Sequence, residues 1–69
     1  MDHDHLITVR PVAGGWRVAL DDLQPLMFLS GRKAEQHARI LAAHLAEIGD
    51  RALVMIHDRA SVLVGLQVF

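Results

Sequence analysis

The alternation of apolar and polar positions between Leu6 and Leu20 predicts two antiparallel strands joined by a tight turn. Apolar side chains take every second position in this stretch: Ile7, Val9, Trp16, Val18 and Leu20. A period of two is typical of strands that bury one face. Gly14 and Gly15 mark the turn, because glycine accepts the positive φ that a tight hairpin requires. We therefore expect a β-hairpin with its tip at residues 13–15, and Pro11 indicates an edge or a bulge in its first strand.

The next stretch changes from strand to helix periodicity. Asp21, Asp22 and Pro25 predict a turn, and residues 26–29 then form a short strand that is apolar on both faces. Ser30 is the expected N-cap of a helix over residues 31–48, which Gly49 ends. The apolar stripe of this helix is centred on Leu41 and also holds Ala34, Ala38, Leu45 and Ile48. One face of the helix should pack on a sheet, with Trp16 as a core anchor beneath it.

Two further strands are expected over residues 53–56 and 62–69, joined by a turn at residues 57–61. The element order is then β-β-β-α-β-β. We predict the α+β class, with a mostly antiparallel sheet of four to five strands and one amphipathic helix packed on one of its faces. Residues 1–69 form a single small domain, of which 1–5 are expected to be a frayed tail.

Composition narrows the classes of partner. The chain has 69 residues, no cysteine and a formal net charge of -1. The missing cysteines exclude disulfides and thiolate metal sites, so we expect a cytoplasmic protein. No apolar run approaches the roughly 20 residues of a membrane span, and no basic surplus is available to hold a nucleic acid. We expect neither a membrane nor a nucleic acid as the main partner.

The placed elements resemble a family of short bacterial proteins, the domain of unknown function 2188 family. The matching positions are Gly14-Gly15-Trp16-Arg17-Val18 on the hairpin, Ala34, Ala38 and Leu41-Ala42 on the helix, and Leu53 to Ile56-His57-Asp58 at the last hairpin. The resemblance implies a small α+β fold and supplies no activity or catalytic residues. Such domains usually carry a glycine in the final turn, where this chain has Ala60 and Ser61, and they tend to be more charged.

Few residues of the chain are suited to catalysis. The hydroxyl nucleophiles are Thr8, Ser30 and Ser61, none of which lies in a Gly-x-Ser-x-Gly setting. Asp21 and Asp22 are adjacent in a turn, so their carboxylates diverge and are better explained as turn residues. We predict no catalytic residues, no cofactor and no metal site, and therefore a protein that is not an enzyme.

The histidines raise two smaller hypotheses. His37 and His44 flank the helical stripe and should be partly buried, either as ordinary boundary residues or as a pH-sensitive contact. They are seven residues apart, about 10.5 Å along a helix, which is too far to share a metal ion. His3 is the third residue after the free amine of Met1. Such an arrangement can bind copper(II) or nickel(II), although a third-position histidine also arises by chance.

The start of the helix carries the residues of an alternative function. Ser30, Gly31, Arg32 and Lys33 put two cations where the helix dipole is already positive. The amide N–H groups and these cations can hold a phosphate or another anion, or the cations can simply be solvated. A weak anion-binding or nucleic-acid-binding module is therefore the alternative hypothesis.

The last three strands supply the preferred hypothesis. Residues 26–29, 53–56 and 62–69 are apolar toward both faces, whereas one helix can cover only one face. The uncovered residues exceed the few hundred Å² of apolar surface that soluble monomers expose. We expect a homodimer or higher homo-oligomer, or contact with another protein, and the predicted interface is Val62, Leu63, Val64, Leu66, Val68 and Phe69.

Overall fold

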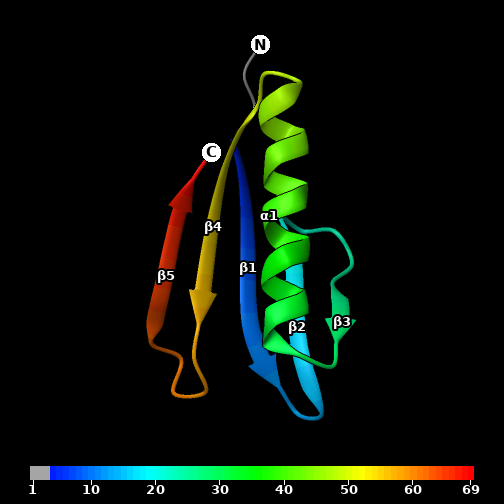
Figure 1. Cartoon of the computed structure of the whole chain (residues 1–69), viewed down its shortest axis with the longest axis vertical. Coiled ribbons are helices and arrows are strands. Elements are labelled where there is room, and N and C mark those ends of the chain that lie inside the picture. The colour runs from blue at the N-terminus through cyan, green and yellow to red at the C-terminus, as the bar shows by residue number, and fades with distance from the viewer. Residues whose placement is uncertain (1–3) are drawn as a thin grey trace.

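One helix and five strands make up the computed structural model, which describes residues 4–69 (Figure 1). In chain order they are β1 (Asp4–Val12), β2 (Gly15–Leu20), β3 (Leu26–Phe28), α1 (Gly31–Glu47), β4 (Arg51–His57) and β5 (Leu63–Val68). The element order and the α+β class are those that the sequence predicts. α1 is not long and apolar enough to cross a membrane, and it is the one helix of the described residues.

The strands form a single mixed sheet in the order β3-β2-β1-β4-β5. Three of the neighbouring pairs are antiparallel, whereas β1 and β4 are parallel, with Ile7 opposite Val54. A parallel pair needs a crossover connection, and here the connection runs through β2, β3 and α1. The prediction of a mostly antiparallel sheet is confirmed, and β1 turns out to be its central strand.

The beginning of β1 corrects the expectation of a frayed tail. Asp4 and His5 belong to the strand and pair with Arg51 and Ala52 of β4, whereas residues 1–3 lie outside the described part of the chain. Pro11 does not mark an edge strand, because β1 is central. It lies beyond the last β1–β4 pair at Val9, where β1 has only β2 beside it, so its missing N–H breaks no ladder there.

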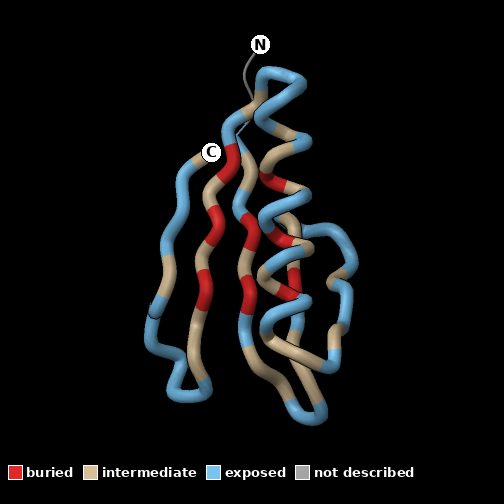
Figure 2. Tube along the Cα trace, in the orientation of Figure 1, coloured by how far each residue is buried: buried red, intermediate tan, exposed pale blue. Residues whose placement is uncertain are grey.

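The hydrophobic core lies between α1 and one face of the sheet (Figure 2). The sheet contributes Ile7, Val9, Val18, Ala52, Val54 and Ile56, and the helix contributes Ala34, Ala38 and Ala42. These alanines repeat every four residues and let the helix axis approach the sheet closely. The buried line of α1 is therefore shifted from the predicted centre: Leu41 and Leu45 pack at its border, and Ile48 is exposed.

Both ends of α1 are capped as the sequence predicts. The Ser30 hydroxyl accepts a hydrogen bond from the Lys33 amide at 3.1 Å. Gly49 has a φ of 91° and ends the helix in a Schellman arrangement, in which Gly49 and Asp50 donate to the carbonyls of Ala46 and Leu45. Local residue chemistry thus sets where the helix starts and stops.

The helix does not extend over β5. α1 packs against β4, β2, β1 and β3 within the described chain, and it reaches β5 through the Arg39 guanidinium, which donates to the Gln67 side chain at 3.2 Å. Arg39 also lies 3.6 Å from Glu35, the ion pair expected from their spacing. β5 is therefore an edge strand whose apolar residues have little cover.

Candidate functional site

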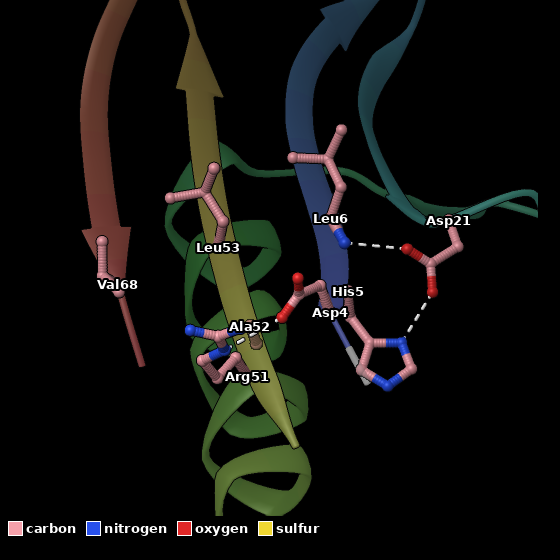
Figure 3. A pocket seen from close by; sticks show the side chains of 8 residues that line it. All are labelled: Asp4, His5, Leu6, Asp21, Arg51, Ala52, Leu53 and Val68. Carbon is pink, nitrogen blue, oxygen red and sulfur yellow. Dashed lines mark hydrogen bonds and ion pairs between the residues drawn. The ribbon is translucent and has the colours of Figure 1, made fainter. Parts of the chain in front are cut away.

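The candidate site is the face of the sheet opposite α1, termed the open face. Ile7, Val9 and Val54 point toward the helix, so the residues between them point away from it. The same alternation, carried across the registers, places these residues on the open face: Asp4, Leu6, Thr8, Arg10, Arg17, Ala19, Met27, Arg51, Leu53, Met55, His57, Leu63, Leu66 and Val68. Figure 3 looks onto part of this face, with α1 behind the strands.

The registers arrange the open face in four rows across the strands. The first row holds Asp4 and Arg51; the second Leu6, Leu53 and Val68; the third Ala19, Thr8, Met55 and Leu66. The fourth row holds Met27, Arg17 and Arg10, and continues with His57 and Leu63 one position beyond the last β1–β4 pair. The two middle rows are apolar apart from Thr8. The first row and most of the fourth are charged or polar, so the open face is an apolar band with polar margins.

The apolar band is well exposed. Leu6 is 42% exposed, Leu66 58% and Val68 77%, whereas Ile7, Val9 and Val54 on the other face are fully buried. Single exposed apolar residues are ordinary, but a contiguous apolar patch on a protein surface marks an interaction site. The chemistry of the open face therefore suits contact with another apolar surface.

The six residues of the predicted interface fall into two groups. Val62, Leu63, Val64, Leu66 and Val68 are exposed. Phe69 differs, because it packs against the buried core and exchanges backbone hydrogen bonds with Ala52. A register shift places Leu63, rather than Val64, opposite His57, so the alternation of β5 changes at this bulge. Leu63, Leu66 and Val68 therefore extend the open face, and Val62 and Val64 lie beside the bulge.

The open face is hollowed near the starts of β1 and β4 (Figure 3). The hollow has a volume of about 590 Å³ and its side chains include Leu6, Leu53 and Val68. Asp4 and Arg51, which form an ion pair at 3.0 Å, lie on its border. Because the hollow opens broadly to solvent and is mainly apolar, it suits an apolar side chain of another protein surface better than a small polar ligand.

His5 joins three segments at the same border. Its Nδ1 lies 2.7 Å from the Asp21 carboxylate and its Nε2 lies 2.8 Å from the Asp50 carboxylate. Asp21 also accepts a hydrogen bond from the Leu6 amide at 2.8 Å. The cluster therefore ties the start of β1 to the turn after β2 and to the loop before β4, and Figure 3 shows its Asp21 side.

The two carboxylates favour the charged imidazole. Hydrogen bonds to Asp21 and Asp50 raise the pKa of His5 above its ordinary value, since the ring can donate from both nitrogens only as imidazolium. The pKa of Asp21 is lowered, first by the Leu6 amide and then by His5. Among the described residues no group of three His, Asp or Glu is placed to hold a metal ion. These hydrogen bonds make the cluster a clamp between three segments.

Sequence reasoning assigned His5 to a tail and Asp21 to a turn, and so missed this clamp. The sequence held two local signals. Position 21 is an aspartate, a residue that tolerates the φ of 50° found there better than most, and Asp50 follows the glycine that ends α1. Neither signal shows that the two residues meet. Their meeting depends on the parallel pairing of β1 with β4, which is a long-range feature.

The start of α1 has a structural reason for its glycine. A Cβ on Gly31 would lie 2.8 Å from the Trp16 indole, so this position is small because the tryptophan packs against it. Arg32 and Lys33 are exposed, and no acidic residue lies in the first turn of the helix. The Ser30 hydroxyl already accepts from the Lys33 amide. The predicted anion-binding residues are thus together at the helix start, with Ser30 and Gly31 engaged within the chain.

The remaining histidines are dispersed. His37 is half-buried as expected, with its ring 5.1 Å from that of Phe28, but its buried Nε2 has no hydrogen-bond partner within the described chain. His44 is exposed, which corrects the expectation that it is partly buried. The shift of the buried line toward Ala38 and Ala42 explains this difference, since it moves His44 outward. The copper hypothesis concerns His3, which lies outside the described residues.

Charges are segregated between the two halves of the molecule. The β1–β2 turn with the adjoining parts of both strands, the start of α1 and the β4–β5 turn lie at one end (Figure 1). They carry five of the seven Lys and Arg residues, namely Arg10, Arg17, Arg32, Lys33 and Arg59. The opposite half holds Asp4, Asp21, Asp22, Glu47 and Asp50 together with Arg51, whereas Asp58 lies at the basic end. A net charge of -1 thus conceals a basic end and an acidic half along an axis of 38 Å.

Fold and surface together define a small α+β protein with one covered and one uncovered sheet face. Comparison of the chain with protein-family models, curated proteins and solved structures found no match. The resemblance to the domain of unknown function 2188 family therefore stays a prediction.

Proposed function

We propose that the protein is a non-enzymatic module that associates with itself through the open face. The observation that carries the proposal is the exposed apolar band on a sheet whose other face is already covered by α1. Burial contributes roughly 25 cal/mol for each Å² of apolar surface removed from water, so covering this band favours association. A second copy of the chain is the partner that is always present at equal concentration.

Sedimentation equilibrium across micromolar concentrations tests the proposal. We expect a dimer or higher oligomer whose association persists when NaCl is raised from about 0.1 M to about 1 M, because apolar contacts are not screened by salt. A monomer at these concentrations would contradict the proposal.

The open face is then tested with Leu66→Lys. A lysine in the apolar band should weaken association by about 2 kcal/mol or more, roughly thirtyfold in Kd, because its ammonium group would lose water on burial. Ile40→Lys is the matched control, since Ile40 is 54% exposed on α1 and Leu66 is 58% exposed on the open face. Equal association of the two variants would place the interface elsewhere.

A second candidate function, weak binding of an anion or a nucleic acid at the start of α1, is supported by the gathering of cations at that end. Arg32 and Lys33 lie in the first turn, where the helix dipole adds to their charge, and Arg10 and Arg17 lie at the same end of the molecule. A phosphate group matches this combination of N–H donors and cations.

Amide NMR shifts on titration with inorganic phosphate, and then with a short DNA duplex, test the second candidate. We expect shifts at Arg32 and Lys33 at low salt that disappear at high salt, with Arg51 in the acidic half as the internal control. If Arg51 shifts as much as Lys33, or if neither residue shifts, the helix start is not a binding site.

A further inference from the structure

The three central strands share a pattern of opposite charges. Each strand carries opposite charges within two residues of its two ends. In order along each strand, the residues are Asp4 and Arg10 of β1, Arg17 and Asp21 at β2, and Arg51 and Asp58 at β4. A strand of this kind attracts a copy of itself that runs in the opposite direction.

We propose that two copies of the chain stack open face to open face about a two-fold axis that runs across the strands. Each central strand then lies antiparallel over its own copy. The proposal rests on the proposed function, namely self-association through the open face, and it specifies how the two copies are oriented. The occupant of the open face is thus a second copy of this chain.

The charged residues of β1 make the open face complementary to itself in this orientation. Reversal places the second row over the partner's third row, so apolar side chains meet apolar side chains. It also places the fourth row over the partner's first row, where Arg10 meets the partner's Asp4. If the strands ran in the same direction instead, the central strand β1 would lie over its own copy without reversal, and Arg10 would face the partner's Arg10.

The arginine pair supports this choice within a single chain. Arg10 and Arg17 lie directly opposite each other on neighbouring antiparallel strands, and both are exposed. Like charges in this position destabilise a sheet, and an acidic group laid over them removes the penalty. Asp4 is available for this role, because its side chain is 74% exposed even though it pairs with Arg51.

Pairing of two β5 edges is the competing arrangement. It also reverses the chain direction, but it extends the sheet sideways and leaves the apolar band of both copies bare. Stacking covers the band, and stacked sheets cross at an angle of about 30°, which displaces outer strands more than the middle strand. β1 is the middle strand of the sheet, so Arg10 and the partner's Asp4 are the contact to test.

The test uses two charge reversals, Arg10→Glu and Asp4→Lys, measured separately and mixed. Each variant alone puts like charges at both symmetric contacts, so we expect its self-association to weaken about tenfold. In the mixture, one contact joins the two substituted side chains, a carboxylate and an ammonium group, and the other joins the original Arg10 and Asp4. A heterodimer should therefore form with an affinity near that of the wild type, and native mass spectrometry separates it from both homodimers.

Two further variants separate local contacts from overall charge. Arg32→Glu changes the charge at the basic end by the same amount as Arg10→Glu, but away from the open face. Glu47→Lys is the equivalent control for Asp4→Lys, at the last residue of α1. We expect near-wild-type self-association for both. Circular dichroism checks that all four variants fold.

The outcomes distinguish the two proposals. Preferred pairing of Arg10→Glu with Asp4→Lys supports reversed stacking. A wild-type dimer without this preference, or an equal loss of association in Arg32→Glu, overturns the stacking while self-association stands. A monomeric wild type overturns both proposals.

Discussion

The indole of Trp16 packs against the first residue of α1, Gly31, so closely that a Cβ there would stand 2.8 Å from the ring. This contact joins β2 to the start of the helix across the core between sheet and helix. Trp16 is thereby confirmed as a core anchor, and the glycine at the helix start has a steric explanation independent of any ligand.

Gly31→Ala should therefore destabilise the protein even though alanine is the better helix former. The added methyl group forces the indole to move, at a cost of about 1–3 kcal/mol, which outweighs the gain of up to about 1 kcal/mol in helix propensity. Urea unfolding followed by Trp16 fluorescence measures the change. In a Trp16→Leu background the same substitution, followed by circular dichroism, should cost much less, and an equal cost in both backgrounds would contradict the steric explanation.

The His5 clamp predicts a stability that changes with pH. Because the pKa of His5 is raised in the folded protein, its contribution is complete below about pH 6.5 and is lost as pH rises through the folded pKa. The lowered pKa of Asp21 sets the acidic limit, since that contribution is lost as pH falls below about 4. The clamp is strongest between these limits.

We expect the stability difference between wild type and His5→Gln to shrink as pH rises from about 6 to about 9. Urea midpoints at fixed protein concentration measure this difference, because self-association also contributes to stability. His44→Gln serves as the control, since it removes an exposed histidine outside the clamp. A difference that stays constant over this range would show that His5 does not titrate against its carboxylates.

The β4–β5 turn contains a residue in an unfavourable backbone conformation. Ser61 has a φ of 61°, in the left-handed region that glycine adopts without a steric penalty. Ser61→Gly should stabilise the protein by about 0.5–1 kcal/mol, because the relief of strain exceeds the added entropy of the unfolded chain. Ala60→Gly, one position earlier, should lower the stability. Thermal unfolding measures both variants. Stabilisation by both variants would indicate a different turn geometry.

Arg17→Glu should have opposite effects on folding and on association. It replaces the Arg10–Arg17 repulsion by a cross-strand ion pair, so a monomer should gain about 0.5 kcal/mol. This gain is measured in the Leu66→Lys background, where association is weak. In the wild-type background, the new carboxylate at position 17 would lie beside the contact between Arg10 and the partner's Asp4, so dimerisation should weaken. Arg59→Glu is the control for overall charge. It should change both the folding stability and the dimerisation much less than Arg17→Glu does.

Local residue chemistry made much of the fold predictable, whereas long-range pairing did not. The hairpin at Gly14, the Ser30 cap and the Gly49 end of α1 each depend on residues within a few positions, and each is confirmed. The parallel pairing of β1 with β4 has no local signature, so the strand start at Asp4 and the His5 clamp were missed.

Periodicity predicted the bounds of the helix more accurately than it predicted which side of the helix is buried. A stripe centred on Leu41 weights large side chains, whereas close packing against the sheet selected the line of small residues at Ala34, Ala38 and Ala42. Likewise, the apolar character of β4 and β5 on both faces predicted an uncovered surface. The sequence could not show that the register shift beside His57 would place Leu63 on it, because a bulge depends on both strands.

The separation of charge along the 38 Å axis gives each chain a permanent electric dipole despite its net charge of -1. A single copy should therefore be retained by both anion and cation exchangers at low salt, each resin holding the opposite end. In the reversed stack the two dipoles point in opposite directions along the strands and cancel. Dielectric relaxation would then report assembly as a loss of dipole moment while the particle itself grows.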